Sequence, residues 1–458
     1  MTPAVVCLTF LSLYGTGSAG ALTATLHRAS DVLVCPARVA HGGDPRRPPQ
    51  RAQHARRGPR AAEATAVTGA LRRAPRGGAG RQDPRTAPTP GDQTTEPVTR
   101  ETVDASIDRL GAFDYAERLK SSRAVRRAPG TIALPALIDA ASGHADGYVR
   151  YRALVLLSGY DDPRVPDQME QALSDPNDRL RAVAYEYYER HPEPRLVPVF
   201  IKAFDKELAE FVRPSLIRAL AAHGKDPKVQ ALLVKDVMRG QDFFRSSVIE
   251  AVGDFKAAYA LKAVTEVAQL DGPLQDDAIL AIGKIGDKSS LPGLAALQRS
   301  APRELQPAVA TAICLLGSNC DLHRGFLSRT LTFAEEQPGF QELLRGAASG
   351  LGALAVNGDT EAGRLLFEVG IPSMDPTRAP VALALAGFAV KRPMAIVPLL
   401  QERQAREPAI ELLREGFDML EEDFAEEQFF VTLRKAYFAE KDAGKKAVMQ
   451  SVITGLEF

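Results

Sequence analysis

The chain has 458 residues, which is too long for one small domain and fits either two or three domains or one array of repeats. Its formal net charge of zero hides an uneven distribution, because residues 1–100 contain fourteen Arg, no Lys and six acidic residues. Four cysteines, Cys7, Cys35, Cys314 and Cys320, are far too few for a disulfide scaffold. Cys314 and Cys320 are close enough in sequence to pair, but nothing in the sequence demands it.

Residues 1–28 contain an apolar run from Val5 to Ala21 that ends in small residues, as in the cleavage region of a signal peptide. No Lys or Arg precedes the run, and it is too short and too interrupted for a stable membrane span. The segment is therefore predicted to be a signal peptide or an apolar leader. The sequence leaves the localisation open: we expect a cytoplasmic protein, or an exported one if this segment is a signal peptide, and a later translation start is a further alternative.

Residues 29–100 are rich in Arg, Pro, Gly and Ala and contain almost no large apolar side chains. Such a segment cannot bury enough apolar surface to offset its ordering entropy, so it is predicted to be disordered. Its Arg pairs could bind acidic surfaces or nucleic acid. A solvated tail is the favoured interpretation, because no aromatic residues interleave for base stacking.

A repeat of about 31 residues follows a leading helix or cap over residues 101–130. One set of positions, here called the anchors, recurs at intervals of 30 to 32 residues and consists of Arg150, Arg181, Arg213, Arg245, Gln275 and Gln306. A second series with the same period lies between the anchors and consists of Leu134, Val165, Val197, Val229, Leu261, Leu291 and Leu322. Two interleaved series with one period indicate two elements per repeat.

Both elements have helical features. Apolar residues recur four and seven positions after each anchor, as in Leu154 and Leu157, which is the spacing of one helical face. Ala stands six positions after the anchor in four repeats, which predicts a close approach of neighbouring helices. Pro135, Pro166, Pro198 and Pro292 directly follow the second series and are predicted to lie in first helical turns.

Turn residues separate the predicted helices and include Asp175 to Asp178 and Gly224 to Pro227. An acid lies three residues before three of the anchors, at Asp178, Glu210 and Asp242, where it would favour the helix dipole of a first turn. The anchor Arg residues are interpreted as structural, and each could bridge to an acid in the next repeat.

Three stretches carry a resemblance to a known family, namely residues 146–154, 175–184 and 278–287. They resemble the bacterial HEAT-like repeat family, also called phycobilisome-lyase-type HEAT repeats. The resemblance covers residues 131–322 as about six repeats and implies an all-α, right-handed alpha-alpha superhelix of the HEAT and armadillo type. Residues 323–458 read as degenerate helical repeats and a C-terminal cap that has lost the Arg anchors, with Glu421 to Glu427 as an exposed acidic end.

No residue set for chemistry is found. His144, His191, His223 and His323 are scattered and form no His-Glu pair, which deoxyhypusine hydroxylase, a similar HEAT-repeat iron enzyme, requires. Cys314, Cys320 and His323 offer three zinc-type ligands but no fourth. No nucleophile elbow and no phosphate loop occur. We therefore predict no catalytic, cofactor-binding or metal-binding residues and no cofactor.

The position five after the anchor is expected to line the concave face, where it reads Val155, Glu186, Arg218, Glu250, Leu280 and Thr311. This series has no basic stripe, which argues against binding of nucleic acid by the repeats. The sequence thus predicts a bacterial scaffold that binds a protein or peptide on the solenoid surface. The alternatives are a bilin-lyase-like or other HEAT-repeat enzyme, and nucleic-acid binding through the Arg-rich N-terminal segment.

Overall fold

A computed structural model describes residues 98–458 except residues 336 and 338. The described residues form α-helices and short 3-10 helices and contain no strand, so the predicted all-α helical solenoid is confirmed. The predicted leader and the predicted disordered segment lie outside the described residues, except that residues 98–100 are described and α3 begins at Arg100. No individual helix of residues 98–458 is long and apolar enough to cross a membrane, although one pair bent by 116°, Arg378–Lys391 with Pro393–Gln401, passes by length and composition.

The helices follow one another with short connections. The α-helices are α3 (Arg100–Asp108), α4 (Tyr115–Arg127), α5 (Gly130–Gly143), α6 (Gly147–Leu157), α7 (Arg164–Ala172), α8 (Asp178–Arg190), α9 (Val197–Phe204), α10 (Arg213–Ala221), α11 (Pro227–Met238), α12 (Asp242–Asp254), α13 (Leu261–Ala268), α14 (Gln275–Ile285), α15 (Leu291–Ser300), α16 (Gln306–Leu315), α17 (Cys320–Glu335), α18 (Gln341–Val356), α19 (Thr360–Gly370), α20 (Arg378–Lys391), α21 (Ile396–Gln401), α22 (Glu407–Leu420), α23 (Asp423–Ala439) and α24 (Ala443–Gly455). The 3-10 helices are η1 (Arg109–Gly111), η2 (Pro194–Leu196), η3 (Ala258–Ala260), η4 (Lys288–Ser290), η5 (Arg303–Leu305) and η6 (Pro393–Ala395).

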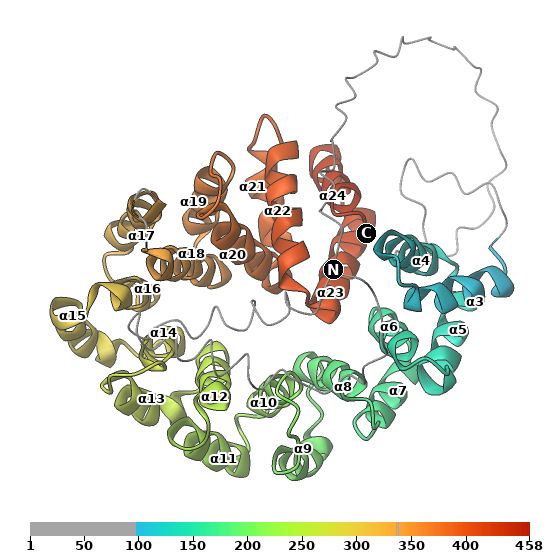
Figure 1. Cartoon of the computed structure of the whole chain (residues 1–458), viewed down its shortest axis with the longest axis horizontal. Coiled ribbons are helices and arrows are strands. Elements are labelled where there is room, and N and C mark those ends of the chain that lie inside the picture. Colours follow the sequence, from blue (N-terminus) through green and yellow to red (C-terminus); the bar gives the residue numbers. More distant parts are fainter. Residues whose placement is uncertain (1–97, 336, 338) are drawn as a thin grey trace, which may run out of the picture. The chain divides into compact units, whose positions relative to one another are not determined.

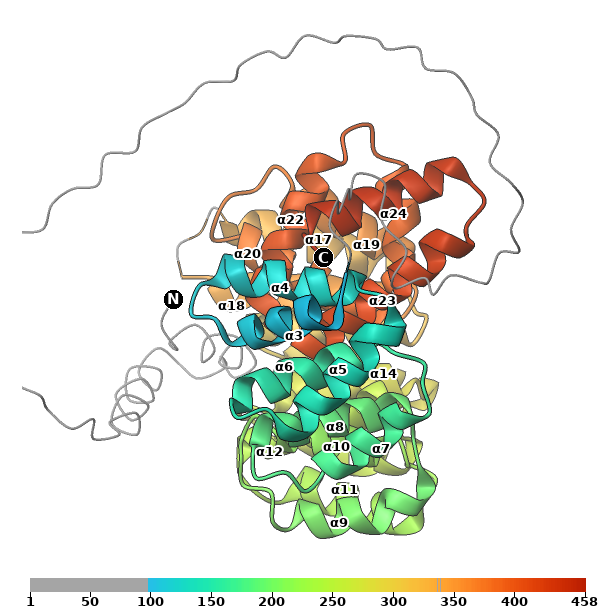
Figure 2. The same ribbon diagram turned by 90° about the vertical axis from the view of Figure 1, so that its right-hand side faces the viewer.

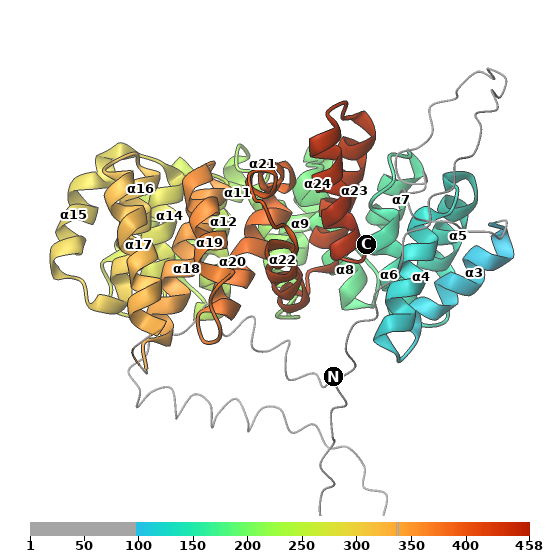
Figure 3. The same ribbon diagram turned by 90° about the horizontal axis from the view of Figure 1, so that it is seen from above.

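The α-helices form two layers of paired elements. From α5 onward each odd-numbered helix is the first of a pair and each even-numbered helix is the second. The even-numbered helices from α8 to α22 pack side by side as an inner row, while the odd-numbered helices from α7 to α19 lie outside them (Figures 1 and 3). Each pair therefore buries its apolar faces against the preceding and following pairs, as expected for a repeat array.

The second helices bury the side chains that the anchor spacing predicted. Leu154, Leu157 and all their equivalents four and seven positions after an anchor are no more than 5% exposed. The close approach predicted at the Ala positions is also present. A Cβ atom on Gly283 of α14 would lie 2.5 Å from the Cα atom of Ala312 on α16, and one on Gly253 would lie 3.0 Å from the Cα atom of Ala281. Small residues on both sides thus allow neighbouring backbones to come together.

Several predicted helix boundaries are correct and two are wrong. Asn177 caps α8 and Asp226 caps α11, because each side chain accepts a hydrogen bond from a first-turn backbone N–H. Gly286 ends α14 with a left-handed φ of 89°. Pro135 lies inside α5 and not in its first turn, since that helix begins five residues earlier, at Gly130. Glu210 precedes α10, which begins only at Arg213, so it is not a first-turn acid.

The anchors stabilise the end of the first helix in their own repeat. Arg150, Arg245 and Gln275 donate side-chain hydrogen bonds to the carbonyls of His144, Val237 and Ala268 respectively. The last carbonyls of a helix have no partner within the helix, and an Arg or Gln side chain supplies the missing donors. The predicted bridge to an acid of the next repeat is present at Arg181, which binds Glu207 at 2.8 Å, but the carbonyl contact is the shared role.

The expected loss of the Arg anchors in the last third of the chain is wrong. Arg378 donates to the carbonyls of Gly370 and Ile371 at the end of α19, and Arg406 donates to the carbonyl of Leu400 in α21. These arginines occupy the anchor position, but insertions in the connections displace them from the regular stride. The same capping contact therefore extends beyond residue 322.

Candidate functional site

The last helices of the chain pack against its first described helices, and we call this contact the seam. Helix α23 lies beside α6 (Figures 1 and 2). Phe424 at the start of α23 is buried in the core formed by residues 103–316. The C-terminal helices therefore cover part of the N-terminal repeats.

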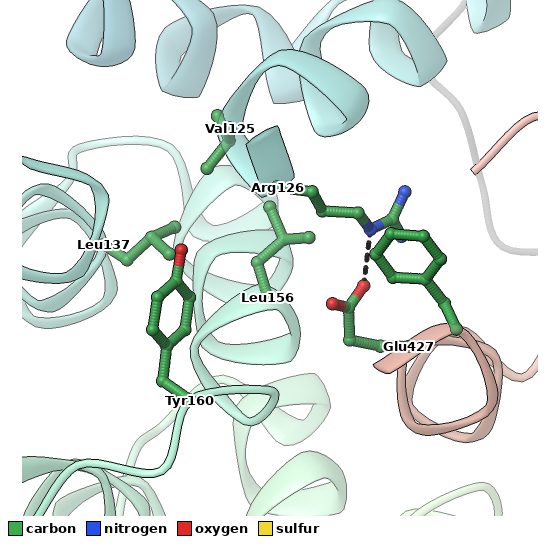
Figure 4. Close-up of a pocket in the computed structure, with 7 residues that line it drawn as sticks. Val125, Arg126, Leu137, Leu156, Tyr160 and Glu427 are labelled. Atoms are coloured by element: carbon green, nitrogen blue, oxygen red, sulfur yellow. Dashed lines mark hydrogen bonds and ion pairs between the residues drawn. The ribbon is translucent and has the colours of Figure 1, made fainter. Parts of the chain in front are cut away.

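A buried ion pair joins α4 to α23 at the seam. The Nε atom of Arg126 lies 2.6 Å from a carboxylate oxygen of Glu427, and the two side chains are 8% and 3% exposed (Figure 4). The guanidinium also lies over the rings of Phe430 and Phe458, with ring centroids 5.2 and 5.6 Å away. Charge pairing and cation–π contacts together offset the cost of removing both charges from water.

A second charged contact joins α6 to α23. The Tyr151 hydroxyl donates to Asp423 at 2.6 Å, and the Arg152 guanidinium forms an ion pair with the same carboxylate. Burial opposes the charge of Asp423, but Arg152 holds the pKa of that carboxyl below its usual value. The prediction of an exposed acidic end is therefore wrong for Asp423 and Glu427. The packing of α23 against α4 and α6 brings Arg152 next to Asp423 and Arg126 next to Glu427.

Burial raises the pKa of two other carboxyls near the seam. Burial raises the pKa of Glu426 to about 8, with a further contribution from Asp423. Burial likewise raises the pKa of Glu186 on α8 to about 8, and the charge of Glu422 adds to that effect. Two helices that meet at the seam thus place acids close together, and protonation relieves their repulsion.

Asp254 at the end of α12 connects the inner row of helices. Its carboxylate lies 3.0 Å from Arg218, 2.7 Å from Lys284 and 3.1 Å from Lys391, which come from α10, α14 and α20. Burial opposes its charge, but these three cations hold the pKa of Asp254 far below its usual value. The basic groups of this part of the inner row are therefore already paired with acids.

The expected exposure of the position five after the anchor is only partly correct. Val155 and Thr311 are fully buried. Glu186, Arg218 and Glu250 are half-buried and belong to the inner charged groups. The expectation rests on helical spacing alone, which does not determine how closely neighbouring helices cover a position.

Exposed apolar side chains recur at the edge where first helices lead into second helices. Six of the twelve large hydrophobic residues that are exposed in residues 98–458 lie at these junctions, and we call them the apolar rim. They are Leu208, Phe211, Met238, Leu270, Phe333 and Met374. Leu208, Met238 and Leu270 follow the repeat stride in three successive repeats, and Phe333 lies two strides after Leu270.

Arginine guanidinium groups form cation–π contacts with aromatic residues near the rim. The guanidinium of Arg213 lies 4.4 Å from the ring centroid of Phe204 and 4.6 Å from that of Phe244. Arg303, in the connection between α15 and α16, lies over the rings of Phe333 and Phe340. Such contacts restrict the side chains at the edge and lower the entropy that a bound partner would have to remove.

The structure places the candidate metal ligands differently from the sequence pattern. Cys314 and Cys320 form a disulfide that joins the end of α16 to the start of α17. The group of metal-type ligand atoms found here within 4.8 Å of one another consists of Cys314, Cys320 and Asp359 and does not include His323. Asp359 pairs with Arg324 at 2.5 Å, and burial lowers the pKa of His323. The Cys-Cys-His arrangement considered from sequence is therefore not assembled.

Comparisons with known proteins address the fold. The model of the family described as HEAT repeats matches residues 134–221. No curated protein matches the chain. A solved structure described as the crystal structure of Kap121p is 13% identical, and the match covers 80% of this chain and 46% of that chain with a TM-score of 0.27. The chain thus spans less than half of Kap121p. Over residues 134–221 the chain is therefore similar to HEAT repeats, and its described helices form a helical repeat solenoid.

Proposed function

We propose that the protein is a non-catalytic scaffold that binds another protein along the apolar rim. The observation that carries the proposal is the recurrence of exposed Leu208, Met238, Leu270 and Phe333 at equivalent junctions of the repeats. Exposed apolar groups that recur along one edge are candidates for an interaction site, since their burial against a partner is favourable. A partner that extends across several repeats would bury several of these groups at once.

The inner row supports the same proposal by its charges. Around Asp254 the cations Arg218, Lys284 and Lys391 are paired within the protein, so this region offers no unpaired basic stripe for phosphate groups. The rim has apolar and aromatic groups instead, which are enriched in the contact regions that dominate protein–protein binding. We extend the proposal to a bacterial origin, on the resemblance carried by residues 146–154 and 175–184.

The experiment compares three tagged proteins isolated from native cells by size-exclusion chromatography after brief cross-linking. The rim variant carries Leu208→Asp and Leu270→Asp, and the control variant carries Val199→Asp and Leu322→Asp, which are exposed away from the rim. We expect the wild type and the control to retain one stoichiometric protein partner, and the rim variant to lose it while its melting temperature is unchanged. Equal retention by all three proteins, or no stoichiometric partner on any, would refute the proposal.

A further inference from the structure

A cleft of about 320 Å³ lies on the seam, and we call it the seam cleft. Its walls come from the connection between α6 and α7, from the end of α8 and from α23, with Asp161, Tyr187, His191, Gln428, Val431 and Lys435 among the lining residues. Its volume is within the range of binding sites for small ligands or single side chains. Because Asp161 and Lys435 are 274 residues apart in the chain, the cleft exists only when the C-terminal helices are docked.

Tyr187 gives the cleft a largely buried aromatic wall. The residue is only 7% exposed and lines the cleft. Burial raises the pKa of Tyr187, and the neighbouring charges of Asp161 and Glu193 raise it further, so the phenol keeps its proton. The phenol can therefore donate a hydrogen bond to a ligand in the cleft or accept one from it.

The other polar atoms of the cleft are mostly acceptors. The Nδ1 atom of His191 lies 3.0 Å from the carbonyl oxygen of Tyr187, which can only accept, so Nδ1 carries the proton and Nε2 of the neutral ring accepts. Gln428 donates through Nε2 to the backbone and side-chain oxygens of Ser158, at 3.2 and 3.0 Å. Its Oε1 atom is then an acceptor without a partner among residues 98–458.

The carboxylate of Asp161 completes this acceptor set. Its side chain is 89% exposed, and its ion pair is with the ammonium group of Lys435 at 3.5 Å, which is a long and solvent-screened contact. The ring of His191 stacks on Tyr187 with centroids 4.2 Å apart and an interplanar angle of 22°. An acceptor-rich cleft beside a stacked aromatic pair is complementary to a planar cation with several donors.

We infer that the seam cleft binds a guanidinium group, carried either by free arginine or by an arginine side chain of a protein partner. A guanidinium has five N–H donors in one plane and stacks on aromatic faces. It would pair with Asp161, displace the weakly held Lys435, and approach the acceptors His191 Nε2 and Gln428 Oε1. Lys435 marks the position that a cation occupies in the absence of this ligand.

Isothermal titration calorimetry on the full-length protein tests the inference with three probes, namely L-arginine, the capped peptide N-acetyl-Gly-Arg-Gly-amide, and L-citrulline. Citrulline has nearly the shape of arginine without its charge. We expect saturable binding of at least one guanidinium probe, at least about tenfold tighter than citrulline, because a hydrogen bond to a charged group is lost with citrulline. Binding of both probes indicates a site open to free arginine, and binding of the peptide alone indicates a site for a partner side chain.

Variants distinguish specific binding in the seam cleft from nonspecific electrostatic attraction of the probe. Asp161→Asn is expected to weaken the binding about tenfold, and Tyr187→Phe to weaken it severalfold. Lys435→Met removes the competing cation and is expected to strengthen binding up to about fivefold. The matched control Asp167→Asn removes a nearby exposed carboxylate on α7 that does not line the cleft, and is expected to change nothing.

The inference is overturned if neither guanidinium probe binds saturably, or if Asp161→Asn and Asp167→Asn affect binding equally. None of these variants touches the apolar rim, and none of the probes requires the rim partner. Failure of the guanidinium site would therefore leave the partner-binding proposal standing, and loss of the rim partner would leave this inference standing.

Discussion

Arg126 on α4 and Glu427 on α23 form a 2.6 Å ion pair across 301 residues of sequence, and both side chains are almost completely buried. This pair belongs to the seam that joins the C-terminal helices to the N-terminal repeats. The seam also contains the contacts of Asp423 with Tyr151 and Arg152. These charged contacts therefore stabilise the packing of the C-terminal helices against the N-terminal repeats.

Removal of one partner of the buried pair is expected to destabilise the protein strongly. Glu427→Leu should lower the free energy of unfolding in urea by about 3–5 kcal/mol, because it leaves the Arg126 guanidinium buried without a counter-charge. The double variant with Arg126→Met should lose much less than the sum of the single variants, since it leaves no buried charge. Additive losses would contradict this explanation. The exposed pair Arg195–Glu170 gives the control, and Glu170→Gln should leave stability unchanged.

The free energy of unfolding is expected to fall as the pH rises from about 4.5 to about 8. The pKa values of Glu186 and Glu426 are raised from the ordinary 4.5 to about 8, so between these values the folded protein holds more protons than the unfolded chain. The free energy of unfolding therefore decreases as pH rises through this window and levels off above about pH 8. Asp423, whose pKa is lowered, has the opposite effect, and its contribution is lost in acid.

Urea titrations at pH 6 and pH 9 measure this dependence. The double variant Glu186→Gln/Glu426→Gln cannot ionise at these positions, so it should lose less stability between the two pH values than the wild type. The control Glu266→Gln changes an exposed residue of α13 and should behave as the wild type. If the double variant and the wild type lose the same stability, the raised pKa values do not contribute.

A methyl group added at the contact between α14 and α16 is expected to destabilise the array. The new Cβ of Gly283→Ala would lie 2.5 Å from the backbone Cα of Ala312, and backbone atoms cannot move aside cheaply. We expect the free energy of unfolding to fall by about 1–2 kcal/mol, although Ala favours helix more than Gly does. Gly293→Ala on α15 has no heavy atom within 4 Å of the new Cβ and should be neutral or stabilising. Thermal denaturation followed by circular dichroism compares the two.

The capping role of the anchors predicts which replacements the repeats tolerate. Gln275 donates to the carbonyl of Ala268 at 3.1 Å from a buried position. Gln275→Leu leaves that carbonyl without its partner and should cost about 1–3 kcal/mol in urea denaturation. Gln275→Arg introduces the donor that other repeats use and should cost clearly less than Gln275→Leu. Equal losses would show that packing, and not the hydrogen bond, determines this position.

The sequence alone determined the features that depend on neighbours within one or two repeats. The anchor stride predicted two helices per repeat, and the spacing of Leu154 and Leu157 predicted which faces are buried. These features follow from helical geometry and short connections, so the local periodicity of the sequence predicts them. The role of the anchors was missed, although the replacement of Arg by Gln, another side-chain donor, was a signal for a hydrogen-bonding role.

Only the tertiary structure decided which distant segments meet. Glu427 and Asp423 read as a solvated acidic end, but docking of α23 buries them against Arg126 and Arg152. The seam cleft has the same origin, because Asp161 and Lys435 come together only through that docking. The local periodicity of the sequence determines the two helices of each repeat and their buried faces. The small rotations between successive repeats, summed over the whole array, decide whether its ends meet, and one sequence does not encode that sum in any single motif.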